Sequence, residues 1–165
     1  WNAAPDIIVN MAPGVKLPCD TVQIPRSQDA NTATGTTTLP IDGTIPQNTE
    51  GDQYMSLAVT PTVAANLLRI SHIGGYTSNA GTGIQMTAAL FQDSTANALH
   101  AMPSGRVNAS GGLAQVKLQH VMLAATTSST TFKIRAGQHN AGTTTFNGYY
   151  GGVMLSSLMI EEIVA

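Results

Sequence analysis

The side chains that most often bind metals are sparse in this chain and widely spaced. The single cysteine, Cys19, has no histidine at a zinc-ligand spacing. His120 lies on the apolar side of an alternating run, which favours a hydrogen-bonded histidine in the core or at a subunit interface. The residues therefore predict neither a metal site nor another cofactor. No two of the four histidines lie within four residues of each other: His72, His100, His120 and His139.

The acidic residues are few, and three of them fall within one stretch rich in turn residues, residues 39–62 (LPIDGTIPQNTEGDQYMSLAVTPT). Oxygen ligands from Asp42, Glu50 and Asp52 would suit a calcium ion if this stretch brought them together. Asp-Gly and Glu-Gly-Asp are also common turn sequences. We therefore favour solvated turn residues and keep a calcium site as the alternative.

The sequence lacks the arrangements that hydrolytic catalysis requires. It has no Gly-x-Ser-x-Gly turn, at which many hydrolases place a nucleophilic serine. A glycosidase needs two carboxyl groups that flank one bond, but Glu161 and Glu162 are adjacent in an expected strand and so point to opposite faces. The paired glycines lack the lysine of a phosphate-binding loop. We expect a protein without enzymatic activity.

The strongest candidate for a binding site is the glycine-rich stretch at residues 139–152 (HNAGTTTFNGYYGG). Glycines on both sides of Tyr149 and Tyr150 would place the two rings on a mobile, exposed loop, where they could stack on sugar rings. The alternative is that the tyrosines pack under their own loop or against a neighbouring subunit. A second glycine-rich loop near residue 75 offers weaker candidates of the same kind. The predicted ligand-binding residues are Tyr149, Tyr150, Asn140, Asn147, His139, Tyr76 and Asn79.

The composition fits one domain with few charges. Of its 165 residues, 42% are hydrophobic and only 10% are charged, against about 25% charged residues in average globular proteins. Polar uncharged side chains must then provide most of the polar surface, which suits a surface covered by other copies of the chain. Because the net charge is −2 and no run of Lys or Arg occurs, we expect no nucleic-acid binding. No apolar run approaches the roughly 18 residues of a membrane span, so we expect no membrane insertion.

Alternating hydrophobic patterns between turn residues predict an all-β fold, an antiparallel β-sandwich or jelly roll. In the run at residues 113–123 one face is nearly apolar and the other mostly polar, which is typical of a half-buried strand. The only helix candidate, residues 95–102, is short and fits a long surface connection better. The predicted strands span residues 19–25, 36–39, 53–60, 66–73, 84–92, 113–123, 131–136, 143–146 and 157–164.

Prolines and polar turn residues predict how these strands are organised along the chain. Prolines in residues 1–18 remove backbone hydrogen-bond donors, so we expect residues 1–35 to form an extended N-terminal arm or linker. Residues 36–165 form the expected jelly-roll-like β-sandwich domain. The predicted turns are a polar loop at residues 27–35, a turn or bulge at Gly74-Gly75, and a hairpin turn at Asn147-Gly148.

The turn-to-strand stretch at residues 39–62, together with several segments nearer the C-terminus, resembles a block that recurs in bacteriophage and prophage tail-fibre and spike proteins. The order and spacing of several short pieces carry this resemblance, which covers about residues 36–163. The pieces are IDGTIPQ at residues 41–47, EG at 50–51, TPT at 60–62, LLRI at 67–70, ALFQD at 89–93, TFKIRAG at 131–137 and SLMIEEI at 157–163.

The resemblance implies a compact jelly-roll-like knob, usually a homotrimer, on a virion appendage and without catalysis. We therefore expect a structural protein at the surface of a phage particle that contacts other virion proteins and attaches to a host surface, with a host-surface glycan as the candidate ligand. Weak contacts from three copies would add up through effective concentration. Other functions stay open: a capsid decoration (cement) protein or head fibre with the same fold, a free carbohydrate-binding module, and a β-sandwich hydrolase.

Overall fold

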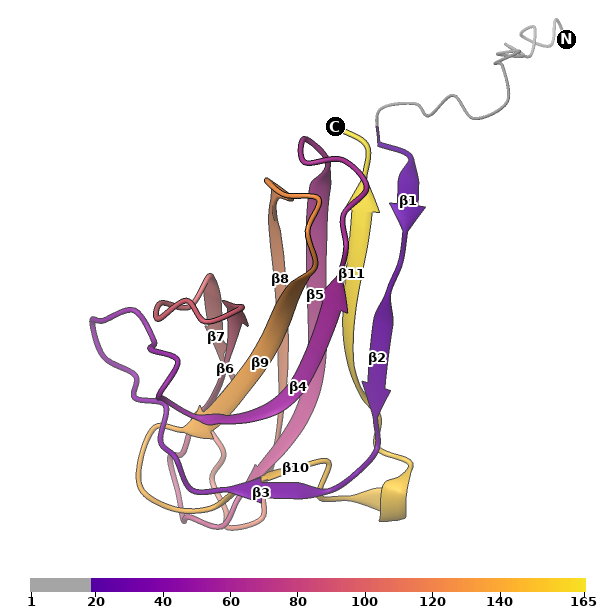
Figure 1. The fold of residues 1–165 in the computed structure, drawn as a ribbon. Coiled ribbons are helices and arrows are strands. Elements are labelled where there is room, and N and C mark those ends of the chain that lie inside the picture. The colour runs from indigo at the N-terminus through magenta and orange to yellow at the C-terminus, as the bar shows by residue number, and fades with distance from the viewer. Residues whose placement is uncertain (1–18) are drawn as a thin grey trace, which may run out of the picture.

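The computed structural model describes residues 19–165; residues 1–18, the first part of the expected arm, lie outside the described residues. No helix in residues 19–165 is long and apolar enough to cross a membrane. The described chain folds into a seven-stranded and a four-stranded sheet, both antiparallel (Figure 1). The larger sheet contains β1 (Thr21–Gln23), β2 (Arg26–Asp29), β3 (Ala33–Gly35), β5 (Leu67–Ser78), β8 (Leu113–Leu123), β10 (Thr144–Phe146) and β11 (Ser156–Ile163). The smaller sheet contains β4 (Asp52–Val59), β6 (Met86–Gln92), β7 (His100–Pro103) and β9 (Thr130–Gln138).

The strand pairing is that of a jelly roll, in which the chain winds between two sheets as nested antiparallel pairs. In the smaller sheet β4 pairs with β9, and β6 pairs with β7 and β9. In the larger sheet β5 pairs with β8 on one side and with β10 and β11 on the other. The predicted all-β antiparallel sandwich is confirmed. Strand β8 has the predicted bounds, and β11 differs from its predicted range by one residue at each end.

Alternating side chains fill the space between the two sheets. In β9, Phe132 and Ile134 are fully buried, whereas Lys133 and Arg135 between them are partly exposed. Strands β8 and β11 alternate in the same way. Burying one such apolar side chain contributes roughly 1.5–3 kcal/mol, so this pattern is what holds the two sheets together.

Residues 36–39 do not form the predicted strand; they cross the outer face of the smaller sheet instead. Leu39 is fully buried with Ala89 and Phe91 in a small second core, and its N–H donates to the Gln138 carbonyl at 3.0 Å. The prediction was wrong because β-branched threonines favour extended backbone without specifying a strand partner. The crossing covers apolar side chains of β6 that would otherwise face solvent.

The turn predicted at Gly74-Gly75 is also wrong, because β5 continues through both glycines to Ser78. A Cβ atom on Gly74 would come within 2.5 Å of His72 Nε2, and one on Gly75 within 1.8 Å of Met154 Cε. The glycines therefore make room for neighbouring side chains rather than end the strand.

The described part of the expected arm belongs to the larger sheet. Strands β1 and β2 pair with β11, and β3 pairs with β10, so residues 27–35 are not the predicted polar loop. The expected boundary after residue 35 therefore does not separate an arm from a domain. The sequence could not show this, because pairing through the main chain requires no apolar pattern in the side chains. The Cys19 N–H donates to the Val164 carbonyl at 2.8 Å, so the two ends of the described chain lie side by side (Figure 1).

Candidate functional site

Strands β10 and β11 lie one after the other along the same edge of β5, and the chain between them makes an excursion. Phe146 is paired with Tyr76, and Ser157 with Ile73. The chain thus leaves the sheet at Asn147 and returns at Ser156, and residues 148–155 form a loop that we call the contact loop. It contains one short 3-10 turn, η1 (Tyr150–Gly152), and lies at the foot of Figure 1, far from the C-terminus.

Asn147 and Ser156 close the neck of the contact loop. The Ser156 hydroxyl donates to Asn147 Oδ1 at 2.7 Å, and the Gly75 N–H donates to Ser156 Oγ at 3.2 Å. Asn147 also donates its side-chain amide to the Asp29 carbonyl at 2.7 Å and its backbone N–H to the Gly75 carbonyl at 3.0 Å. It is only 1% exposed, and its φ of 49° lies in the left-handed region that asparagine tolerates well. The predictions of Asn147 as a ligand contact and as a hairpin turn are wrong, since it anchors a long loop.

The contact loop is exposed at its tip and held at its base. The Tyr149 hydroxyl donates to the Gly111 carbonyl, and Met154 packs over Gly75. Tyr150 is 70% exposed with a φ of 61°, and its ring centroid lies 6.0 Å from that of Tyr149. Tyr150 is therefore exposed, as expected. The flanking glycines suggested a mobile loop, but hydrogen bonds at Tyr149 and at the neck hold its base.

Two apolar residues of the contact loop were missed by the sequence reasoning. Val153 is 75% exposed, and Leu155 is also exposed. The sequence did contain a signal for them, because apolar residues inside a glycine-rich turn are rarely buried in a core. With Tyr150 they make an apolar, uncharged tip, since residues 148–155 contain no charged side chain.

Neighbouring loops are hydrogen-bonded into one surface beside the contact loop. Asn79 Oδ1 accepts from the Thr143 N–H at 2.7 Å, and the Ser110 hydroxyl donates to the Asn79 carbonyl at 2.9 Å. The Gly111 N–H donates to the Ser78 carbonyl at 2.7 Å. Asn79 is exposed, so the structure brings this predicted residue to the same end as Tyr149. Its side-chain oxygen is already used by the loop, which leaves the amide N–H groups to face solvent.

The remaining predicted residues from the same stretch are placed differently. His139 is partly exposed, and its Nδ1 accepts from the Gln85 N–H at 3.2 Å. Asn140 is exposed. His139 therefore supports the backbone at Gln85, just before β6, and Asn140 is the freer of the two for contact with a partner.

Tyr76 was predicted as a loop residue and is instead a core residue of β5. It is fully buried, and its hydroxyl donates to His72 Nε2 at 2.9 Å. Its ring lies beside those of Tyr54 and Phe146. Burial raises the pKa of the Tyr76 hydroxyl, and burial lowers the pKa of His72 to about 4. The prediction failed because the two preceding glycines resembled a turn, and no ligand can reach this side chain.

The acidic residues of the 39–62 stretch accept hydrogen bonds at three separate places. Asp42 Oδ1 accepts from the Thr44 N–H at 2.8 Å, and Glu50 Oε2 accepts from the Gln47 N–H at 2.9 Å. Asp52 accepts from both the backbone and the hydroxyl of Thr37 at 2.9 Å. In residues 19–165 no three His, Cys, Asp or Glu side chains gather as metal ligands would. The calcium alternative is therefore not supported. The turn interpretation agrees with the bonds of Asp42 and Glu50, whereas Asp52 lies in β4 and holds the crossing segment through Thr37.

Two histidines that are distant in the sequence meet where β7 approaches β8. The ring centroids of His100 and His120 lie 6.2 Å apart. Burial and the neighbouring His100 lower the pKa of His120. This pair was not foreseen, because the sequence gives no information on which strands approach across the two sheets.

Comparisons with known proteins add little to this geometry. No protein-family model matches the chain, and no curated protein matches it either. Among solved structures, Eiger TNF from S. frugiperda is similar over 86% of this chain and 94% of that one, at 6% identity and a TM-score of 0.47. A structure of the infectious bursal disease virus Gx strain is similar over 95% of this chain and 42% of that one, at 12% identity and a TM-score of 0.40. The enzymatically active domain of bacteriophage CBA120 tailspike protein 4 is similar over 85% of this chain and 19% of that one, at 9% identity and a TM-score of 0.29. The fold assignment therefore rests on the strand pairing itself.

Proposed function

We propose that this chain is a non-enzymatic structural component of a phage virion, a knob domain of a fibre or spike that attaches to a host surface. One observation carries the proposal: the ends of the described chain and the contact loop lie at opposite ends of the sandwich (Figure 1). Cys19 is bonded beside Val164, where β11 ends, whereas the contact loop precedes the start of β11. The eight residues of β11 separate the two ends by roughly 23 Å at about 3.3 Å per residue.

This arrangement suits a domain held at one end that makes contacts at the other. The tip offers Tyr150, Val153 and Leu155 to a partner without any charge to desolvate, and a tyrosine ring can stack on the apolar face of a sugar. A left-handed backbone at a residue other than glycine costs of order 1–3 kcal/mol, and residues strained in this way cluster at functional sites. The φ of 61° at Tyr150 is such a case. Hydrogen bonds at the base limit the conformations open to the tip, which lowers the entropy lost on binding.

The proposal includes assembly into a homotrimer. The outward face of the larger sheet carries a row of apolar side chains, Leu67, Leu123 and Ile163, which face one another across three strands. Val121 and Ile73 on the same face are also exposed. The ion pair of Arg69 and Glu161 lies beside this row on the same face, and we expect the apolar row itself to be covered by other copies of the chain. Light scattering of the purified domain should give three times 17.1 kDa, and a monomer would contradict this part of the proposal.

Adhesion can be tested with the domain labelled at Cys19, which is exposed, is the single cysteine and lies far from the contact loop. The fluorescent domain should bind cells of a bacterium that the phage infects. The double variant Tyr150→Ala, Val153→Ser should lose most of this binding while its thermal midpoint stays close to that of the wild type, because both side chains are solvent-exposed. Val63→Ser is the matched control, since Val63 is an exposed valine at the opposite end. Equal binding by the double variant and the control would refute the assignment of the contact loop.

A capsid decoration protein or head fibre with the same fold is the second candidate. It is favoured by the position of Cys19 beside the end of β11, because residues 1–18 join the domain at that point, away from the contact loop. Deletion of residues 1–18 should abolish attachment to capsids if the chain decorates them. If the chain is a fibre knob, the same deletion should leave binding to host cells intact.

A further inference from the structure

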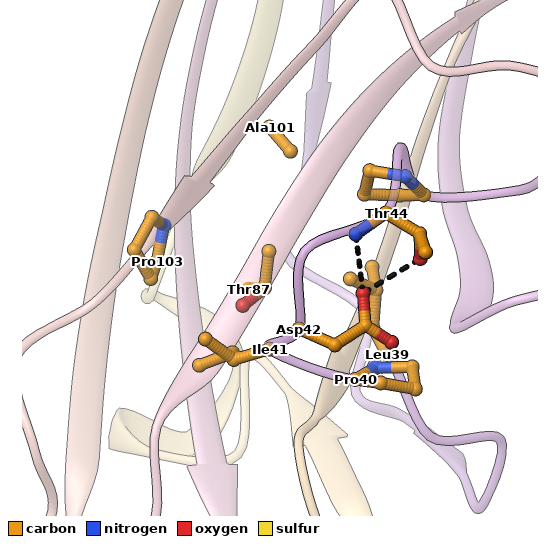
Figure 2. Close-up of a pocket in the computed structure, with 9 residues that line it drawn as sticks. Leu39, Pro40, Ile41, Asp42, Thr44, Thr87, Ala101 and Pro103 are labelled. Carbon is orange, nitrogen blue, oxygen red and sulfur yellow. Dashed lines mark hydrogen bonds between the residues drawn. The ribbon is translucent and has the colours of Figure 1, made fainter.

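A small hollow lies on the outer face of the smaller sheet, beneath the segment that crosses it. Figure 2 shows Thr87 of β6 between Pro103 of β7 and the turn that contains Ile41. The volume of the hollow is about 160 Å³. Leu39 and Ala101 complete most of its apolar lining.

The Thr87 hydroxyl is a buried polar group without a partner. Thr87 is 4% exposed, and its Oγ1 makes no hydrogen bond to any described residue. Three of the lining residues are prolines, which have no backbone N–H to donate: Pro40, Pro46 and Pro103. A hydroxyl that is removed from water without gaining a partner is destabilising, so a ligand that bonds to it would gain affinity.

The rim of the hollow carries one carboxylate with a free oxygen. Asp42 is exposed, and both hydrogen bonds from Thr44 go to Oδ1, at 2.8 Å from the backbone and 2.6 Å from the hydroxyl. Within the described residues, Oδ2 accepts no hydrogen bond. The bonds from the Thr44 side chain and backbone lower the pKa of Asp42, so this oxygen is an acceptor at neutral pH. Figure 2 shows Asp42 next to Leu39 and Pro40 at the edge of the hollow.

We propose that this hollow binds the acetamido group of an N-acetylated sugar. The methyl group would lie against Ala101 and the prolines, and the amide would hydrogen-bond to the Thr87 hydroxyl. A ring hydroxyl would donate to Asp42 Oδ2 at the rim. A purely aliphatic ligand would leave the Thr87 hydroxyl unpaired, whereas an acetamido group supplies a methyl and a hydrogen-bonding amide side by side. This inference rests on the proposed function in adhesion and names a ligand class for it, at a second site apart from the contact loop.

The inference can be tested by saturation-transfer NMR on the full chain. The two ligands are N-acetylglucosamine and glucose, which lacks the acetamido group. N-acetylglucosamine should show transfer centred on its methyl group, and glucose should show none. Ala101→Leu, which fills the hollow, should abolish the transfer. Thr87→Val should weaken binding by up to about tenfold, the equivalent of one hydrogen bond. Thr131→Val is the matched control, because Thr131 lies partly exposed on β9 of the same sheet, and it should bind like the wild type.

Folding and function are controlled separately. Thr87→Val should have a thermal midpoint at or above that of the wild type, because it removes an unpaired hydroxyl. A lower midpoint would show that the Thr87 hydroxyl has a hydrogen-bond partner in the folded protein. Three results would overturn the inference. They are equal transfer to the two sugars, transfer that is retained in Ala101→Leu, and no transfer at all because the hollow holds only water. Equal binding of N-acetyl-lysine would overturn the assignment to a sugar. None of these results affects the adhesion test of the contact loop, whose failure would instead refute the proposed function.

Discussion

Glu162 is a buried carboxylate that joins the end of β11 to the chain between β4 and β5. It is 0% exposed. Its Oε1 accepts from the Thr62 N–H at 2.8 Å, the Thr62 hydroxyl at 2.7 Å and the Asn66 amide at 2.7 Å. Its Oε2 accepts from the Gln23 amide at 2.6 Å. Every partner is a neutral donor, so the network is built for the ionised carboxylate, and replacement of Glu162 by glutamine should be costly.

The cost can be worked out from the proton affinity of the site. Burial alone would raise the pKa of Glu162, but the hydrogen bonds from Gln23, Thr62 and Asn66 outweigh it and lower the pKa from 4.5 to about 2. At about 1.4 kcal/mol per pKa unit, the folded protein prefers the charged form by roughly 3 kcal/mol. Glu162→Gln should therefore lower the free energy of unfolding by about 3 kcal/mol at pH 7.

The loss should depend on pH with a defined sign. Because the pKa is lowered on folding, the stability from Glu162 is present above pH 4.5 and is lost as the pH falls toward 2. The difference between wild type and Glu162→Gln should then shrink to about 1 kcal/mol at about pH 3. Urea denaturation followed by circular dichroism at pH 7 and pH 3 measures both values. Glu161→Gln is the control, since Glu161 pairs with the partly exposed Arg69, and such pairs contribute at most about 1 kcal/mol. A Glu162→Gln variant as stable as the wild type, or a deficit that does not change with pH, would refute the reasoning.

Two further predictions concern the core and the neck of the contact loop. Burial lowers the pKa of His72 from 6.5 to about 4, so the wild type should lose about 3 kcal/mol of unfolding free energy as the pH falls from 6.5 to 4. In denaturant titrations over that range, His72→Gln should lack this dependence, and an unchanged slope would contradict it. Asn147→Ala should lower the unfolding free energy by about 2–4 kcal/mol, because it leaves the buried Ser156 hydroxyl without its acceptor and puts alanine at a positive φ. The exposed Asn140→Ala should have no effect, and equal stability of the two variants would show that the neck is not closed by Asn147.

The all-β class could be predicted from the sequence because it depends on local alternation. Strand β8 has one apolar and one polar face, and its predicted bounds agree with the structure. Leu39 shows the limit of this reasoning. It forms a second core with Phe91 on the outer face of a sheet, a position that depends on how the chain crosses the sandwich and leaves no periodic pattern.

The candidate site was found only in part for the same reason. Tyr149 and Tyr150 could be placed in a loop because glycines flank them. Tyr76 and Asn147 looked similar in the sequence, but one is paired within β5 and the other is bonded to Asp29, which lies 118 residues away in the sequence. Hydrogen bonds over such separations are set by the topology, and a single sequence does not reveal them.

The central claim is that the domain is held on a phage particle by one end and presents the contact loop at the other. Cryo-electron microscopy of the particles that carry this chain would test it most directly. We predict density for the sandwich in which Cys19 and Val164 face the particle and residues 148–155 point outward. Particles without this domain, or density in which residues 148–155 are buried against the particle, would contradict the account.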